Sequence, residues 1–181
     1  MGSTGAALRR GATAGLVGTA VMTVSQAVEG KITGRPPSTV PGKVGVTLLG
    51  GDKDDSTRVR ALNPWVHWGH GIAMGALRGV LGQRVAGSAA ATGTHFAGLW
   101  SGDVLLYQAL GVAPPPWEWS PQELTTDIGH KGLYALVTGA TYDALDRRTE
   151  RRSGSAQQAR GGQPDVDAGG VVHERRMPRL R

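Results

Sequence analysis

Two pairs of ionisable side chains lie one helical turn apart in this sequence: His67 with His70, and Asp127 with His130. Residues three positions apart share a face of a helix, so each pair can present two polar groups to one neighbour. Imidazole and carboxylate groups bind metals inside helix bundles, and histidine exchanges a proton near neutral pH. The pairs therefore allow metal or haem ligation, proton transfer, or hydrogen bonds that only hold packed helices together.

The elements that must position these residues are helices. Ser120 and Glu123 have the spacing of a capping box at a helix start, and Asn63-Pro64 marks another helix entry. Stretches with little charge and much Gly and Ala predict four helices, at about 8–29, 64–82, 86–110 and 121–145.

The remaining segments are predicted to lack regular structure. Residues 30–63 contain three prolines and Gly50-Gly51, which predict a loop with a short apolar patch at 44–49. Residues 149–181 are rich in Arg, Gly, Gln and Ser and contain few apolar side chains, so we expect a disordered basic tail. The fold class we predict is all-α, with a four-helix transmembrane bundle over residues 1–148.

The residue types on the polar stripes favour lipid over water as the solvent of this bundle. Soluble bundles cover their outer faces with Lys, Glu and Arg, whereas these stripes contain Gly, Thr, Ser, His and single acids. Gly71, Gly75 and Gly79 form a small-residue ladder that lets membrane helices pack closely. The mean hydropathy of −0.21 argues the other way, although charge is concentrated in residues 31–60 and after Asp146. A soluble helical bundle stays the alternative.

Ionisable residues on inward-facing stripes would meet inside the bundle. We expect Arg78 to form a buried ion pair with Asp103 or Asp127, and Lys131 to find an acidic partner or extend to water. Without Cys or an H-E-x-x-H motif, metal ligation has only weaker candidates, namely His67, His70, His95, Asp127 and His130. The candidate intramembrane polar cluster consists of His67, His70, Arg78, His95, Asp103, Asp127, His130 and Tyr134. No catalytic residue is predicted.

The basic residues indicate an orientation. The net charge is +6, and arginines flank the first and last apolar segments, as expected of cytoplasmic ends under the positive-inside rule. No nucleic-acid-binding module accompanies them, which argues against that partner. The arginines after the last helix could instead contact anionic lipid: Arg147, Arg148, Arg151 and Arg152.

Residues 65–148 contain two short motifs, one at the end of the third predicted helix and one inside the fourth. The third predicted helix ends in Leu110-Gly111 followed by Pro114-Pro115 and a Trp, and the fourth contains Asp127-Ile128-Gly129-His130. In these features the chain resembles the YagU-type small inner-membrane proteins of bacteria. The resemblance implies a multi-pass location in the bacterial inner membrane and brings no reaction. We therefore expect a small integral membrane protein with a structural or small-solute and proton-handling role, as a monomer or homo-oligomer. A metal- or haem-binding enzyme that uses the His/Asp cluster is the alternative.

Overall fold

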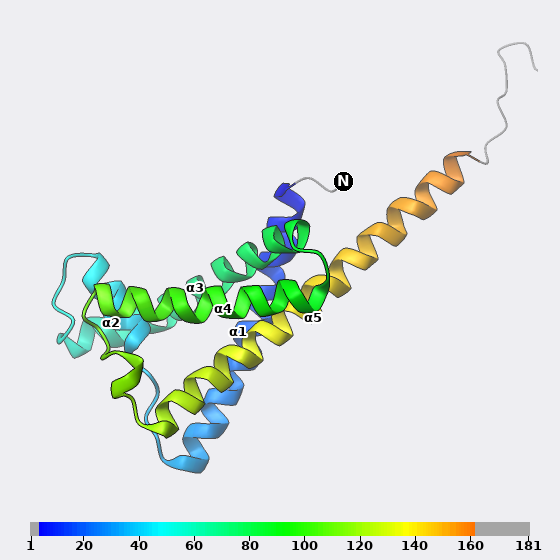
Figure 1. Cartoon of the computed structure of the whole chain (residues 1–181). Helices are drawn as coiled ribbons and strands as arrows, with labels where there is room; N and C mark the ends of the chain where they lie inside the picture. Colours follow the sequence, from blue (N-terminus) through cyan, green and yellow to red (C-terminus); the bar gives the residue numbers. More distant parts are fainter. Residues whose placement is uncertain (1–3, 162–181) are drawn as a thin grey trace, which may run out of the picture. The chain divides into compact units, whose positions relative to one another are not determined.

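The computed structural model describes residues 4–161, and all the regular elements in that range are helices, which confirms the all-α prediction. They follow the chain in the order shown in Figure 1. The elements are α1 Thr4–Thr33, α2 Val40–Leu48, α3 Ser56–Arg84, α4 Ser88–Ala109, the short 3-10 helix η1 Pro116–Glu118, and α5 Pro121–Gly161.

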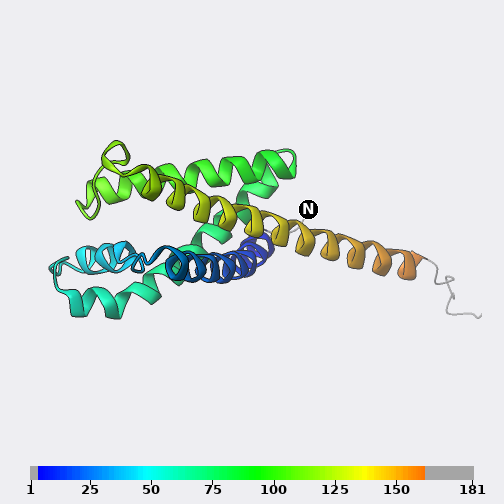
Figure 2. The same cartoon turned by 90° about the horizontal axis from the view of Figure 1, so that it is seen from below.

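The chain divides into two compact units, residues 1–146 and 147–181. Within the first unit, α1 and α2 lie in one layer and α4 and α5 in another (Figure 2). Helix α3 starts beside α2 and ends beside α4, so it belongs to both layers.

Helices α1 and α3 approach until their backbones touch. A Cβ atom added to Gly75 would lie 2.5 Å from the carbonyl oxygen of Gly11 and 2.6 Å from the amide nitrogen of Gly15. One built on Gly15 would lie 2.5 Å from the carbonyl oxygen of Gly71. The small-residue ladder predicted on α3 therefore packs against a second glycine ladder on α1, and any larger side chain would separate the two helices.

The predicted loop over 30–63 is wrong in three places, because it contains the last turn of α1, the whole of α2 and the first turns of α3. Helix α3 begins at Ser56, where Asp55 caps it: its Oδ1 accepts hydrogen bonds from Thr57 and Arg58 amides at 3.0 and 3.1 Å. Pro64 lies inside the helix and does not start it. The preceding Asn63 instead accepts a hydrogen bond from the Gly42 amide at 2.8 Å, which joins α2 to α3.

Helix α5 begins with the predicted capping box. The Ser120 amide and hydroxyl both donate to Glu123 Oε2 at 2.8 Å, and the Glu123 amide donates back to the Ser120 hydroxyl. The helix continues to Gly161, beyond the predicted end near 145. Residues 147–161 contain Arg, Gln and Ala, which are good helix formers, and their described side chains are exposed. The rest of the predicted disordered tail lies outside the described residues.

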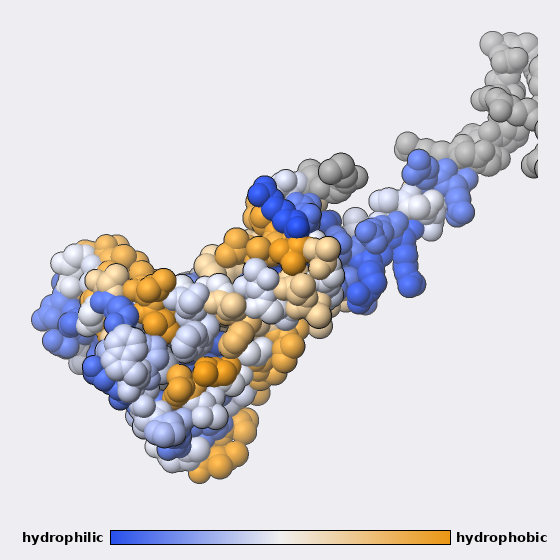
Figure 3. Space-filling model, in the orientation of Figure 1, coloured by the Kyte–Doolittle hydropathy of each residue, from blue (hydrophilic) through white to orange (hydrophobic). Residues whose placement is uncertain are grey.

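The interior of the first unit contains several large polar side chains among its apolar residues. The largest fully buried side chains are Arg78, Tyr134, His95, Val46, Thr19 and Thr138. Exposed apolar side chains instead follow α1: Leu8, Leu16, Val17, Val21, Val24, Val28 and Ile32. Figure 3 shows such apolar residues, in orange, at several places on the visible surface. Apolar residues such as Val44, Val59 and Leu99 are buried as well, but buried charged groups together with a row of exposed apolar side chains on one helix are uncommon in water-soluble domains.

Candidate functional site

A row of ionisable side chains crosses the bundle from α3 through α4 to α5. His70 Nε2 lies 3.0 Å from Asp103 Oδ1, and the other oxygen of Asp103 lies 3.0 Å from Lys131 Nζ. Lys131 Nζ also lies 3.1 Å from Asp127 Oδ1. The second oxygen of Asp127 accepts a hydrogen bond from Trp100 Nε1 at 3.0 Å. We call the four ionisable residues, His70, Asp103, Lys131 and Asp127, the HDKD network.

The HDKD network is most deeply buried at its centre. Asp103 is 5% exposed and Lys131 12%, whereas His70, at one end, is 37% exposed. The Lys131 ammonium also lies 5.2 Å from the centroid of the Tyr107 ring, which adds a cation–π contact. The expectation that Lys131 finds an acidic partner is confirmed, and it has two.

Arg78 does not pair with Asp103 or Asp127, and this prediction is wrong. Its Nη2 lies 3.2 Å from Asp143 Oδ1, and its guanidinium stacks 5.1 Å above the Tyr142 ring. Arg78 is eight residues, or about 12 Å of helix, beyond His70 on α3. It therefore reaches the other end of α4 and α5, where Asp143 also accepts a hydrogen bond from the Ser88 hydroxyl.

Sequence reasoning missed Asp143 as a functional partner. Asp143 is not among the residues of the predicted cluster. The short turn between α3 and α4 could have indicated the pairing of Arg78 with Asp143. This turn sets the register of the two helices and places Arg78 near the turn, too far from Asp103.

The two histidine-containing pairs from the sequence are separated by the structure. His67 shares a hydrogen bond of 3.0 Å with the Thr23 hydroxyl on α1, while His70 faces α4. Asp127 joins the HDKD network, whereas His130 is buried and points to Ser25 on α1.

The remaining two members of the predicted cluster bind backbone carbonyls of α3. His95 Nε2 contacts the Met74 oxygen at 3.0 Å, and the Tyr134 hydroxyl donates to the Gly71 oxygen at 2.6 Å. The five metal-ligand candidates therefore face different neighbours. Among residues 4–161, no three His, Asp or Glu side chains are grouped so that they could hold a metal ion.

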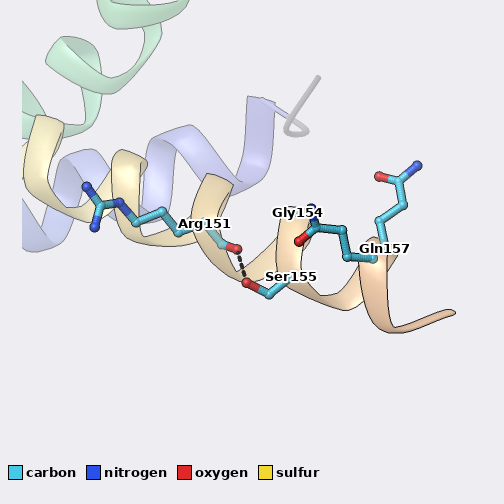
Figure 4. A pocket seen from close by; sticks show the side chains of 5 residues that line it. Arg151, Gly154, Ser155 and Gln157 are labelled. Carbon is cyan, nitrogen blue, oxygen red and sulfur yellow. Dashed lines mark hydrogen bonds between the residues drawn. The ribbon is translucent and has the colours of Figure 1, made fainter. Parts of the chain in front are cut away.

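A surface hollow is present on the part of α5 that belongs to the second unit. Figure 4 shows its lining, and the Ser155 hydroxyl there donates to the Arg151 carbonyl at 3.0 Å, a bond within one helix. The hollow contains none of the residues of the predicted polar cluster, but it includes Arg151, one of the arginines expected to contact anionic lipid. Its lining residues are Arg151, Gly154, Ser155, Gln157 and Gln158.

Comparisons with family models, with curated proteins and with solved structures found no match for this chain. The resemblance to YagU-type proteins stays a prediction from the motifs.

Proposed function

We propose that the chain is a four-pass integral membrane protein of the bacterial inner membrane, as its YagU-like motifs imply. The spans would be α1, α3, α4 and the first part of α5, with both termini in the cytoplasm. Its HDKD network would then be an intramembrane site that handles protons or a small polar solute.

The observation that carries this proposal is the combination of buried charged side chains with a row of exposed apolar side chains on α1. A buried Leu, Ile or Val stabilises a protein in water by about 1.5–3 kcal/mol. Helix α1 leaves seven large apolar side chains exposed while the bundle interior contains Arg78, His95 and Asp103. Lipid contact accounts for both features, because it solvates the apolar faces and drives polar groups toward one another. Among the described residues, α1 alone meets a length and hydropathy criterion for a membrane span, a criterion that the core helix of a soluble protein and a signal sequence also meet. The proposal that α3, α4 and α5 also span therefore rests on the burial pattern and on the YagU-like motifs.

The positions of the helix ends support the proposed orientation. Arg10 on α1 forms a 2.8 Å ion pair with Asp146 on α5, and the Ser88 hydroxyl next to the α3–α4 turn bonds to Asp143. The start of α1, that turn and the end of the fourth span therefore lie at one end of the bundle. The arginines of that end agree with a cytoplasmic side, although residues 31–60 place basic side chains at the other.

Carbonate extraction of native membranes tests integration. We expect the protein to stay with the bilayer, and release into the supernatant would favour the soluble helical bundle instead.

Orientation can be tested on a clean background, because the chain contains no Cys. A membrane-impermeant maleimide should label Asp54→Cys from the periplasmic side, and should label Ala86→Cys only after the inner membrane is permeabilised. The reverse labelling pattern would show that the proposed orientation is inverted.

Function and packing can be separated at Asp103. Ionisable groups in a membrane interior are costly and are usually retained for a role in transport or proton transfer. Proton flux into proteoliposomes should fall in Asp103→Asn while the protein remains folded by circular dichroism. Unchanged flux in a folded variant would leave the network with a packing role only.

A further inference from the structure

Two buried side chains of the first unit have polar atoms without a hydrogen-bond partner among the described residues. These atoms are Nε and Nη1 of Arg78 and Nδ1 of His95, and the two residues are 0% and 1% exposed. Buried polar groups in proteins are nearly always paired, because an unpaired group loses its hydration without compensation. The three atoms therefore indicate where a further hydrogen-bonding molecule binds.

Arg78 and His95 lie at the same level of the bundle, on neighbouring helices. Arg78 is eight residues from His70 on α3, and His95 is eight residues from Asp103 on α4, both in the direction of the α3–α4 turn. The Arg78 guanidinium reaches the Thr92 hydroxyl, one turn from His95, at 3.5 Å, and its charge acts on the His95 ring. This level is therefore separated from the HDKD network by about 12 Å of helix.

The contacts show what each of the three atoms needs. His95 Nε2 forms a hydrogen bond of 3.0 Å with the Met74 carbonyl oxygen, which can only accept, so Nε2 carries a hydrogen. A second buried cation beside Arg78 would be unfavourable, so the imidazole is neutral and Nδ1 has an unused lone pair. Nε and Nη1 of Arg78 are N–H donors. The molecule that pairs with them must both donate and accept hydrogen bonds.

The neighbouring side chains are already engaged. Asp143 accepts hydrogen bonds from Arg78 Nη2 at 3.2 Å and from the Ser88 hydroxyl. The Tyr134 hydroxyl donates to a carbonyl oxygen of α3 at 2.6 Å. A bound cation at this level would be repelled by the Arg78 charge, and a bound anion would be repelled by the Asp143 carboxylate. The site therefore suits a neutral molecule.

We propose that a buried water molecule binds between α3 and α4, where it donates a hydrogen bond to Nδ1 of His95 and accepts one from Nε or Nη1 of Arg78. Water is neutral, donates and accepts, and typically makes about three hydrogen bonds when it is buried. The site goes beyond the proposed function and does not depend on it. It requires only the two buried side chains, whether lipid or water surrounds the bundle.

The experiment follows the transfer of magnetisation from water to the nitrogen sites of uniformly ¹⁵N-labelled full-length protein in lipid bilayers, by magic-angle-spinning NMR. The backbone amide of Ala14 is the dry reference, because this residue is 0% exposed and lies within α1. The His95 ring and the Arg78 guanidinium should receive water magnetisation severalfold faster than the Ala14 amide, although their side chains are just as buried.

Two variants test whether the two side chains share the water. His95→Phe keeps a ring at this position but has no ring nitrogen, so transfer to the Arg78 guanidinium should fall severalfold. His67→Phe is the matched control: it makes the same replacement on α3, eleven residues from Arg78, and should leave that transfer unchanged. Circular dichroism checks that both variants are folded.

Fast transfer that is lost in His95→Phe and retained in His67→Phe supports the water site. Transfer to His95 and Arg78 as slow as to Ala14 would overturn it, and so would transfer to Arg78 that His95→Phe does not change. If His95→Phe does not fold, the wild-type comparison with Ala14 still decides whether water binds there. Release by carbonate together with fast transfer would reject the membrane location and leave the water site standing.

Discussion

Replacing Gly75 with alanine tests whether backbone contact between α1 and α3 holds the bundle together. The added methyl group would lie 2.5 Å from the Gly11 carbonyl oxygen and 2.6 Å from the Gly15 amide nitrogen. Ordinary contacts between non-bonded heavy atoms are about 3.5–4.0 Å. The helices must therefore move apart by about 1 Å, because the obstructing atoms are backbone and cannot rotate away.

The expected loss of stability follows from two opposing effects. Overpacking of this kind destabilises by about 1–3 kcal/mol, and we expect the upper part of that range because both neighbours are backbone. Alanine gains about 1 kcal/mol over glycine through helix propensity. The net effect is a loss of about 2 kcal/mol in the free energy of unfolding.

Gly98 on α4 supplies the matched control. A Cβ atom at that position meets nothing within 4 Å, so Gly98→Ala should be neutral or stabilise by up to about 1 kcal/mol. Reversible unfolding in mixed detergent micelles, followed by circular dichroism, measures both variants. Equal stability of the two variants would refute the close α1–α3 contact.

Three further predictions concern single interactions. Tyr134→Phe should lose about 1 kcal/mol of unfolding free energy in the same assay, because its buried hydroxyl donates to a carbonyl of α3. Asp143→Ala should lose about 3–5 kcal/mol, since it leaves the buried Arg78 guanidinium without its carboxylate, and a loss below about 1 kcal/mol would contradict that pairing. The hydrogen bonds from the Ser120 amide and hydroxyl lower the pKa of Glu123. The capping box therefore stabilises the start of α5 fully at pH values above the pKa that Glu123 has in the unfolded chain. This stabilisation is lost as the pH falls through the lower pKa of the folded state. Amide exchange at Ser120 should accelerate over that acidic interval, and Glu123→Gln should remove the pH dependence.

The sequence predicted correctly those features of the helices that depend on residues close together in the chain. The capping box at Ser120 and Glu123 and the glycine ladder on α3 depend on residues close in sequence, and both are present. The start of α3 was placed too late, because Pro64 was interpreted as a first-turn proline. Asp55 supplies a strong cap about two turns before Pro64, so the helix begins earlier and includes the proline in its interior.

The residues of the predicted cluster were identified better than the contacts that they make with one another. All eight residues of the predicted cluster have their polar atoms in contacts between helices or at buried positions, yet the ion pairs follow the register of the helices against one another. That register depends on turn lengths and on the rotation of each helix, which a stripe on a single helix does not specify. His67 and His70 share a stripe, but they do not contact the same helix. The rotation of α3 in the bundle places His67 against α1 and His70 against α4.

Helix α3 connects the glycine contact to the ionisable network. Gly71 and Gly75 fix its rotation against α1, and His70, next to Gly71 in the chain, is directed toward Asp103 by that rotation. A separation of α1 and α3 by about 1 Å is as large as the difference between a 3.0 Å ion contact and one that water can enter. The glycine ladder therefore does more than stabilise the fold: its close contact with α1 keeps α3 in the position from which the His70 imidazole and the Asp103 carboxylate meet at 3.0 Å.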